Sequence, residues 1–410
     1  MIDTKEMEKL PEGWKRIKLG KVLDYEQPIN YIVKSENYDQ KSGIPVLTAG
    51  KTFILGYTDE TEGVFKDVPV IIFDDFTTES KFINFSFKVK SSALKILKLG
   101  YDRNNIHFLY NAMQILNFNP GSEHKRYWIS EYSNTVIPLP SLPEQEKIAE
   151  ILETVDNTIE KTDAIIEKYK RIKQGLMQEL LTKGIDSNWK IRSEKTHKFK
   201  DSPLGKITEE WEVKKLGEIN HIIMGQSPNS SLVNKIGNGI AFLQGNAEFT
   251  DKYPNPTNWI EKPLKIANKG NILISVRAPI GALNITDRQY CIGRGLASIE
   301  PYNNLTDKFY LWNFIHFHIN ELIKLGQGST FEAIGSKELF NLQISLPPLP
   351  EQERIASVIS QVDAVIEKET AYRDKLSRIK QGLMEDLLTG KVRVTTLLEN
   401  KNNQYQKEVL

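Results

Sequence analysis

The sequence has a single cysteine, Cys291, and no apolar run near the roughly 18 residues that a membrane-spanning helix needs. A lone cysteine excludes an internal disulfide and is typical of proteins in a reducing compartment. Residues 1–10 are polar and of mixed charge, so no signal peptide is expected there. We therefore expect a cytoplasmic protein that makes no contact with a membrane.

Net charge is also nearly absent, because 54 basic residues face 53 acidic ones. The charges are unevenly distributed along the chain. From Lys88 to Arg126 there are seven Lys/Arg and two acidic residues, and from Glu261 to Arg294 there are six and two. From Glu144 to Glu167 there are eight acidic residues and two lysines. Two basic regions on separate domains would each suit a phosphate backbone, with the acidic stretch facing away from it.

Sequence motifs for catalysis are missing. There is no phosphate-binding Gly-x-x-x-x-Gly-Lys loop, no dinucleotide-binding glycine pattern, and no Asn/Asp-Pro-Pro-aromatic tetrapeptide of amino-methyltransferases. His316 and His318 are two apart on an expected helix, so they point in different directions. Asp74 and Asp75 suit a turn better than a metal pair, and Cys291 lacks an evident base. We predict neither an active site nor a metal site.

A repeat dominates what the sequence does contain. Residues 142–183 recur at 349–390, with 24 identities in 42 positions and no gap. Apolar residues in both copies alternate three and four apart, which predicts a long helix with a coiled-coil seam. Gly184 and Gly390 are expected to end these helices. Neither helix is apolar enough to stand alone, so we expect each to pack against the other.

Four polar residues interrupt the expected seam, namely Lys173, Glu369, Arg373 and Lys380. The simpler interpretation is that their long side chains extend along the edge of the coil. The alternative is that this part of the coil packs against another subunit.

The segments before the two helices are related more weakly. Trp14 and the following Leu19-Gly20 correspond to Trp211 and Leu216-Gly217. We predict strands at 68–73, 81–89, 93–97, 271–276, 282–286 and 296–299, and helices at 106–116 and 308–325. The resulting division is 1–140 and 211–347 for two mixed domains, 141–184 and 348–391 for the helices, 185–210 for a polar linker, and 392–410 for a tail.

Loops with amide, hydroxyl and arginine side chains are candidates for DNA contacts. In the second domain these are Gln226, Ser227, Arg277, Arg294, Gln327, Ser329 and Thr330. In the first domain they are Lys51, Thr77, Thr78, Lys125, Arg126 and Tyr127. An alternative for Arg277 and Arg294 is that they pair with acidic residues and hold their own loops together.

These features resemble the specificity subunit of type I restriction–modification enzymes over nearly the whole chain. The most specific marks are Leu-Pro-x-Leu-Pro-Glu-Gln-Glu at 139–146 and again at 346–353, each followed by a helix with Gln-Gly-Leu-Met near its end. Gly-Gln-Ser-Pro at 225–228 and Gly-Arg-Gly at 293–295 are similar to the family's recognition domains. Phe76 stands where the family often has histidine, so no role of that histidine transfers.

The resemblance implies an α+β protein in which two target recognition domains are joined by an antiparallel coiled coil with pseudo-twofold symmetry. Each domain would read half of a bipartite DNA site, and the helices would set the spacer. The chain itself would hold no cofactor and no catalytic site. Two modification subunits with S-adenosylmethionine, and restriction subunits with ATP and Mg, would be its partners. The candidate partner contacts are Glu144, Gln145, Glu146, Glu351, Gln352 and Glu353.

Two other functions remain open from the residues alone. One is a recognition module detached from a single-chain methyltransferase or endonuclease, although such an enzyme needs no second docking helix. The other is a structural adaptor that binds proteins. A steep loss of DNA binding with rising salt would distinguish a DNA reader from an adaptor.

Overall fold

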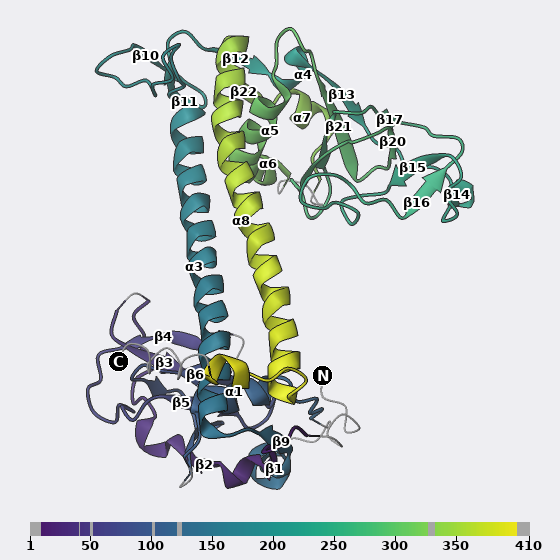
Figure 1. Ribbon diagram of the computed structural model, residues 1–410. Helices are drawn as coiled ribbons and strands as arrows, with labels where there is room; N and C mark the ends of the chain where they lie inside the picture. The colour runs from purple at the N-terminus through teal and green to yellow at the C-terminus, as the bar shows by residue number, and fades with distance from the viewer. Residues whose placement is uncertain are drawn as a thin grey trace. The chain divides into compact units, whose positions relative to one another are not determined.

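The computed structural model describes residues 10–40, 42–49, 52–100, 103–120, 125–326 and 333–399. The chain divides into two units: the first comprises 1–164 and 370–410, and the second comprises 165–369. Each unit holds one globular domain and one part of each of two long helices (Figure 1). Within the described residues, no helix is both long and apolar enough to cross a membrane.

The long helices are α3 (Leu142–Leu180) and α8 (Leu349–Thr389). In both units the two helices lie side by side and antiparallel, so the predicted helix pair is confirmed (Figure 1). The buried residues between them include Ile148, Leu152, Met384 and Leu387 in the first unit, and Met177, Leu180, Ile355 and Ile359 in the second. Gly184 and Gly390 follow the helices with φ of +74° and +78°, a left-handed conformation that favours glycine.

Three of the polar residues that interrupt the seam form ion pairs across it. Lys380 Nζ lies 2.5 Å from Asp156 Oδ1 in the first unit, and Lys173 Nζ lies 2.6 Å from Asp363 Oδ1 in the second. These two pairs join corresponding residues of the repeat. The third residue, Arg373, contacts carboxylates of both helices. Partner carboxylates, and not simple extension into solvent, therefore explain these cations.

In the described residues, the globular domain of the first unit has three small sheets. Their strand orders are β2-β8-β5-β6, β4-β3-β7 and β1-β9. The strands are β1 (Lys15–Lys18), β2 (Leu23–Glu26), β3 (Ile44–Leu47), β4 (Ile54–Thr58), β5 (Val70–Asp74), β6 (Ser80–Ile83), β7 (Lys88–Val89), β8 (Leu94–Leu99) and β9 (Val136–Leu139). The helices are α1 (Ile106–Gln114), α2 (Tyr127–Ser130) and three single 3-10 turns at Leu19–Lys21, Pro28–Tyr31 and Tyr132–Asn134.

The second unit repeats this plan with a larger second sheet. Its strand orders are β13-β21-β18-β19, β14-β16-β15-β20-β17, β12-β22 and the hairpin β10-β11. The strands are β10 (Phe199–Ser202), β11 (Gly205–Thr208), β12 (Glu212–Lys215), β13 (Asn220–Met224), β14 (Val233–Asn234), β15 (Ile240–Leu243), β16 (Asn258–Ile260), β17 (Ile266–Ala267), β18 (Ile272–Ser275), β19 (Leu283–Ile285), β20 (Tyr290–Ile292), β21 (Leu296–Pro301) and β22 (Gln343–Leu346). The helices are α4 (Leu216–Ile219), α5 (Lys308–Phe317), α6 (Ile319–Gly326), α7 (Ser336–Phe340) and a 3-10 turn at Ser230–Leu232.

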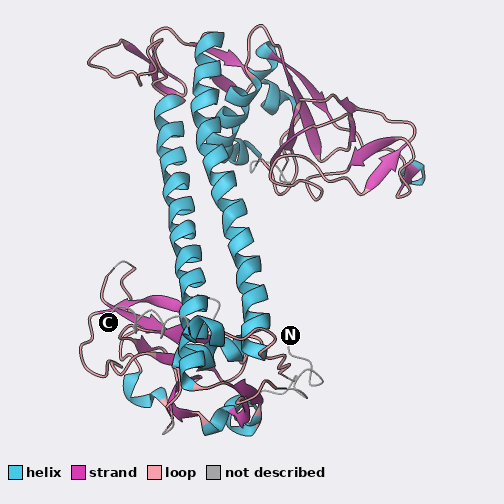
Figure 2. Cartoon of the chain, viewed as in Figure 1, coloured by secondary structure: helices cyan, strands magenta, loops and turns pink. Residues whose placement is uncertain are grey.

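Topology makes the two domains equivalent despite their different sequences. The four-stranded sheets have the same order and antiparallel pairing, and a parallel pair, β3–β7 or β15–β20, lies in the second sheet of each unit. Helix α5 packs between α8 and the four-stranded sheet of the second unit (Figure 2). The predicted α+β class with two mixed domains is confirmed.

The structure corrects three boundaries. The run 81–89 is divided into β6 and β7, which belong to different sheets. The predicted helix at 308–325 is α5 and α6, with a break at His318. The segment 185–210 is not a plain linker, since it contains the β10–β11 hairpin and buried residues such as Ile185 and Ile207.

Candidate nucleic-acid interface

The polar edge of the second domain begins where two parallel strands end together. Strands β15 and β20 pair with Leu243 opposite Ile292, and the N–H of Gly293 donates to Leu243 O at 2.7 Å. Because parallel strands end at the same edge, Gln244 and Arg294 follow on neighbouring loops. Both residues are exposed to solvent.

The loop after β13 packs directly on this edge. The N–H of Gln226 donates to Ile292 O at 3.0 Å, and Gln244 Nε2 donates to Ser227 Oγ at 3.0 Å. A Cβ on Gly225 would lie only 2.1 Å from Gly293 O, so the close approach of the two backbones requires glycine at position 225. The Gly-Gln-Ser-Pro and Gly-Arg-Gly motifs therefore form one surface.

A third loop, after β18, adjoins the same surface. The N–H of Val276 donates to Gly295 O at 2.9 Å, and the N–H of Ile334 donates to Val276 O at 2.9 Å. Arg277 follows Val276 and is exposed. Neither Arg277 nor Arg294 forms an ion pair with a residue in the described ranges. The alternative in which these arginines hold their loops together thus finds no support among those residues.

A cavity of about 630 Å³ opens at this edge. Its lining includes the polar residues Ser227, Asn234, Lys235, Gln244, Asn258 and Arg294, together with apolar residues such as Phe242. Among the described residues, the lining has two cations and no carboxylate, so its charge suits a polyanion. Of these residues, Asn234, Lys235, Gln244 and Asn258 were not predicted. The available signal was that Gln244 is a polar residue directly after a buried strand.

The first domain places its predicted residues at the turn after β5. Asp74 Oδ1 accepts from the N–H of Phe76 at 2.9 Å, and Asp74 Oδ2 accepts from Thr77 Oγ1 at 2.7 Å. Thr78 has a φ of +64° in the same turn. Asp74 thus has the expected turn role, and the exposed Thr77 is accessible from solvent.

Arg126 and its neighbours lie beside this turn. The N–H of Tyr127 donates to Asp75 O at 2.9 Å, which corresponds to the bond from Ile334 to Val276 O in the second unit. Arg126 is exposed, and Lys125 Nζ lies 2.5 Å from Glu131 Oε1. The structure corrects the prediction for Tyr127, whose side chain is 1% exposed and packs in the core.

Four predicted DNA contacts fall outside the described residues: Lys51, Gln327, Ser329 and Thr330. The basic region from Lys88 to Arg126 is also corrected. Lys88 pairs with Glu60 at 3.0 Å, Lys95 with Asp75 at 3.3 Å, and Lys98 with Glu26 at 2.5 Å. Charge counted along the chain overstated the surface charge there, because the compensating carboxylates come from distant segments.

The candidate partner contacts Glu144 and Glu351 are corrected, because both are buried and bind within the chain. Glu144 Oε1 accepts from Arg393 Nη2 at 2.8 Å and from Trp14 Nε1 at 3.5 Å. Glu351 binds the guanidinium of Arg192 and accepts from Trp211 Nε1 at 3.2 Å. Each unit thus fixes the start of its domain, through a tryptophan, to the start of one long helix.

Gln145 and Gln352 are corrected for the same reason, being 2% and 0% exposed. Their side-chain oxygens accept from the N–H of Asn105 at 2.9 Å and of Asp307 at 2.8 Å. Asn105 and Asp307 are the N-cap residues of α1 and α5, so the glutamines attach each long helix to the helix of its domain. Glu146 and Glu353 are exposed, and their partner role stays a prediction.

Some titratable groups elsewhere in the described part of the chain have shifted pKa values. No group of three or more His, Cys, Asp or Glu suited to a metal occurs among those residues. Burial lowers the pKa of His107, with nearby acidic residues opposing that effect. Burial, with a hydrogen bond to Asp287, raises the pKa of Tyr290 to about 12. Cys291 is fully buried, as expected for core packing.

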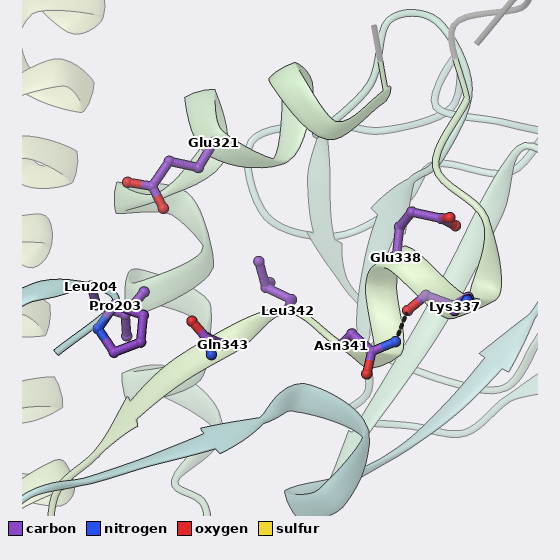
Figure 3. Close-up of a pocket in the computed structure, with 8 residues that line it drawn as sticks. All are labelled: Pro203, Leu204, Glu321, Lys337, Glu338, Asn341, Leu342 and Gln343. Carbon is purple, nitrogen blue, oxygen red and sulfur yellow. Dashed lines mark hydrogen bonds between the residues drawn. The ribbon is translucent and has the colours of Figure 1, made fainter. Parts of the chain in front are cut away.

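A second cavity, of about 490 Å³, lies between the β10–β11 hairpin and the segment around α7 (Figure 3). Glu321 and Glu338 line it from two different helices, and Asn341 Nδ2 donates to Lys337 O at 2.8 Å. An anionic ligand would meet two carboxylates here. The cavity beside Gln244 is therefore the better candidate for a nucleic-acid contact.

Known proteins resemble this chain along most of its length. A family model for the type I restriction modification DNA specificity domain matches residues 11–171 and 208–378. A Methanocaldococcus jannaschii sequence described as a type I restriction enzyme MjaX specificity subunit is 40% identical over 312 residues, which is 75% of this chain and 70% of that protein. The EcoR124I/EcoR124II specificity subunit of Escherichia coli is 30% identical over 386 residues, 89% of each chain.

Solved structures agree with this assignment. A chain from a study of complex assembly and conformational transition of the type I R-M system has a TM-score of 0.57 at 26% identity, and the match covers 94% of this chain and 100% of that one. The type I restriction-modification S subunit from M. genitalium has a TM-score of 0.65 at 16% identity, covering 93% and 97%. The second likeness supports the fold.

Proposed function

The chain belongs to the family of type I restriction–modification DNA specificity subunits, and from this membership we propose that it reads a bipartite DNA site with one half-site per unit. As a member of that family it is a DNA recognition subunit without catalytic activity of its own. The observation that carries the division into half-sites is that topologically equivalent loop edges bear different side chains in the two units.

The second unit supports this role most directly. Arg277 and Arg294 are exposed on adjoining loops, together with the amides of Gln226 and Gln244 and the hydroxyl of Ser227. Arginines bind phosphate oxygens or guanine, and amides and hydroxyls bind base edges in the major groove. A rigid backbone edge that presents these groups suits the reading of a short sequence.

The long helices would set the spacing between the half-sites. Their sequences share 24 of 42 positions between the copies without a gap, so they can present a similar face to two identical modification subunits. Restriction subunits would complete the assembly, with S-adenosylmethionine, ATP and Mg held by the partners. A subunit with this role would act in the cytoplasm, where such a system meets DNA.

Substitution of the arginines tests the proposal. We expect Arg277→Ala and Arg294→Ala, each in the full chain with its modification subunits, to weaken binding at only the half-site read by the second unit. Arg126→Ala should affect only the other half-site. The measurement is selection from a randomised duplex library followed by sequencing, with binding repeated at several salt concentrations.

The salt series separates DNA reading from an adaptor role. The slope of log K against log salt is negative, and each lost phosphate contact should make it less steep by about 0.9. Equal affinity of the unaltered complex for selected and random DNA would reject sequence recognition.

A further inference from the structure

We propose that Gln244 reads one adenine in the half-site bound by the second unit, an inference that rests on the proposed function. Gln244 directly follows β15 at the edge where β15 and β20 end, and its side chain lines the cavity of about 630 Å³. No other glutamine in the described ranges lines that cavity.

The backbone of Gln244 is held tightly in place. A Cβ on Gly293 or Gly295 would lie 2.9 Å from Gln244 O, so the Gly-Arg-Gly loop packs directly on this residue. The N–H of Gly293 also donates to the preceding residue, Leu243, at 2.7 Å. Because this backbone is already fixed, binding of a base by Gln244 does not require the loop itself to become ordered.

The amide of Gln244 is oriented but not fully used. Nε2 donates one hydrogen to Ser227 Oγ at 3.0 Å. An amide nitrogen carries two hydrogens, so a second hydrogen and the lone pairs of Oε1 stay available. Adenine presents N7 as an acceptor and N6 as a donor in the major groove, and a glutamine amide can bind both at once. Ser227 is thus a positioning residue for this contact.

Charge around the amide favours nucleic acid. Lys235 and Arg294 line the same cavity, and neither forms an ion pair within the described residues. Their positive charges can bind the phosphates that flank a base read by Gln244.

The first unit lacks this amide at the equivalent place. Strand β3 ends at Leu47 beside Val89 of the parallel β7, as β15 ends at Leu243 beside Ile292. The next residue is Thr48, which is only partly exposed. We therefore assign the adenine contact to the half-site of the second unit alone.

The test uses the full chain with its modification subunits, a randomised duplex library and sequencing of the bound DNA. We expect Gln244→Ala to reduce the preference for adenine at one position by about tenfold to a hundredfold. Gln244→Glu should shift that position toward cytosine, because a carboxylate accepts from cytosine N4. Gln244 is exposed, so neither substitution disturbs the core.

Gln289 provides the matched control. It is also an exposed glutamine whose amide is held by a neighbour, with Nε2 donating to Asn268 Oδ1 at 3.1 Å, but it precedes β20 at the opposite end of that strand. Gln289→Ala should leave the selected motif unchanged.

The outcomes separate this inference from the function on which it rests. If the unaltered complex selects a bipartite motif and the Gln244 variants select the same motif, Gln244 does not read a base, and the proposed function stands. If the unaltered complex selects no motif, both are overturned. A change confined to the half-site of the first unit would also overturn the assignment.

Discussion

The two units have side chains of different character at equivalent positions of their four-stranded sheets. In the first unit Lys95 on β8 lies opposite Phe73 on β5, and its ammonium pairs with Asp75. In the second unit the matching strands place Ala297 opposite Ile274, and Val276 follows where the aspartate would be. An ion pair with 0% and 1% exposed side chains thus corresponds to an apolar contact.

This difference shows that the shared topology accommodates either a buried ion pair or an apolar pair at the same position. Removing two charges from water costs about as much as their attraction returns, so a buried pair and an apolar pair can give similar stability. The Lys95–Asp75 pair therefore adds little stability beyond what an alanine and a valine provide at the equivalent positions. Loss of a single partner is different, because it leaves an unpaired charge in the core.

The largest expected effect follows from breaking the Lys95–Asp75 pair. Lys95→Ala leaves Asp75 buried without its cation, and we expect the first unit to lose about 3–5 kcal/mol of stability. The double variant Lys95→Ala/Asp75→Val copies the second unit and should recover part of the loss. Recovery stays incomplete, because the N–H of Trp128 loses its bond to Asp75 Oδ1.

Hydrogen exchange resolved by peptide measures this loss separately in each unit. Peptides from β5 and β8 should exchange faster in Lys95→Ala, whereas peptides from β18 and β21 serve as the internal control. A double variant less stable than Lys95→Ala would contradict the equivalence of the two cores.

A second comparison concerns the glutamates that start the long helices. Glu351 is paired with Arg192, whose side chain is 7% exposed, whereas Glu144 is paired with Arg393, whose side chain is 32% exposed. We expect Glu351→Gln to lower the stability of the second unit by about 3 kcal/mol, near the lower limit for a broken buried ion pair. The loss stays near this limit because Glu210 Oε2 still lies 3.3 Å from Arg192 Nη2.

Glu144→Gln should cost less, about 1–2 kcal/mol, since water can solvate part of Arg393. The measurement is again peptide-resolved hydrogen exchange, at the helix ends beside Gly184 and Gly390. Equal losses in the two units would show that the exposure of the arginine does not set the cost. Glu146→Gln and Glu353→Gln, at exposed neighbours, are the matched controls.

Sequence patterns predicted the features that depend on residues close together in the chain. The seam of α3 and α8 follows from apolar spacing, and α8 ends directly before Gly390, whereas α3 ends at Leu180, four residues before Gly184. The same patterns could not show that Glu144 and Gln145 are buried, because their partners Arg393 and Asn105 are distant in sequence. Tertiary contacts determined those environments.

The candidate site shows the same limit. Glycine motifs singled out the loops that hold Ser227 and Arg294, but the contact between these loops depends on the parallel pairing of β15 with β20. Their role in binding DNA stays a prediction. Gln244 was missed because no motif marks it. In the first unit, the sequence does not show that Tyr127 is buried, because its burial depends on tertiary packing.

The smallest expected effect is at the ion pairs between the long helices. Asp156 with Lys380, and Asp363 with Lys173, join corresponding residues of the repeat at 2.5 and 2.6 Å. All four side chains are partly exposed, so Asp156→Asn and Asp363→Asn should each cost less than about 1 kcal/mol, and less still in high salt. A double-mutant cycle in each unit, at low and high salt, measures the coupling energies. If the repeated sequences also give equivalent energetics, the two coupling energies agree. A large difference would mean that the divergent domains change the interactions within the repeated helices.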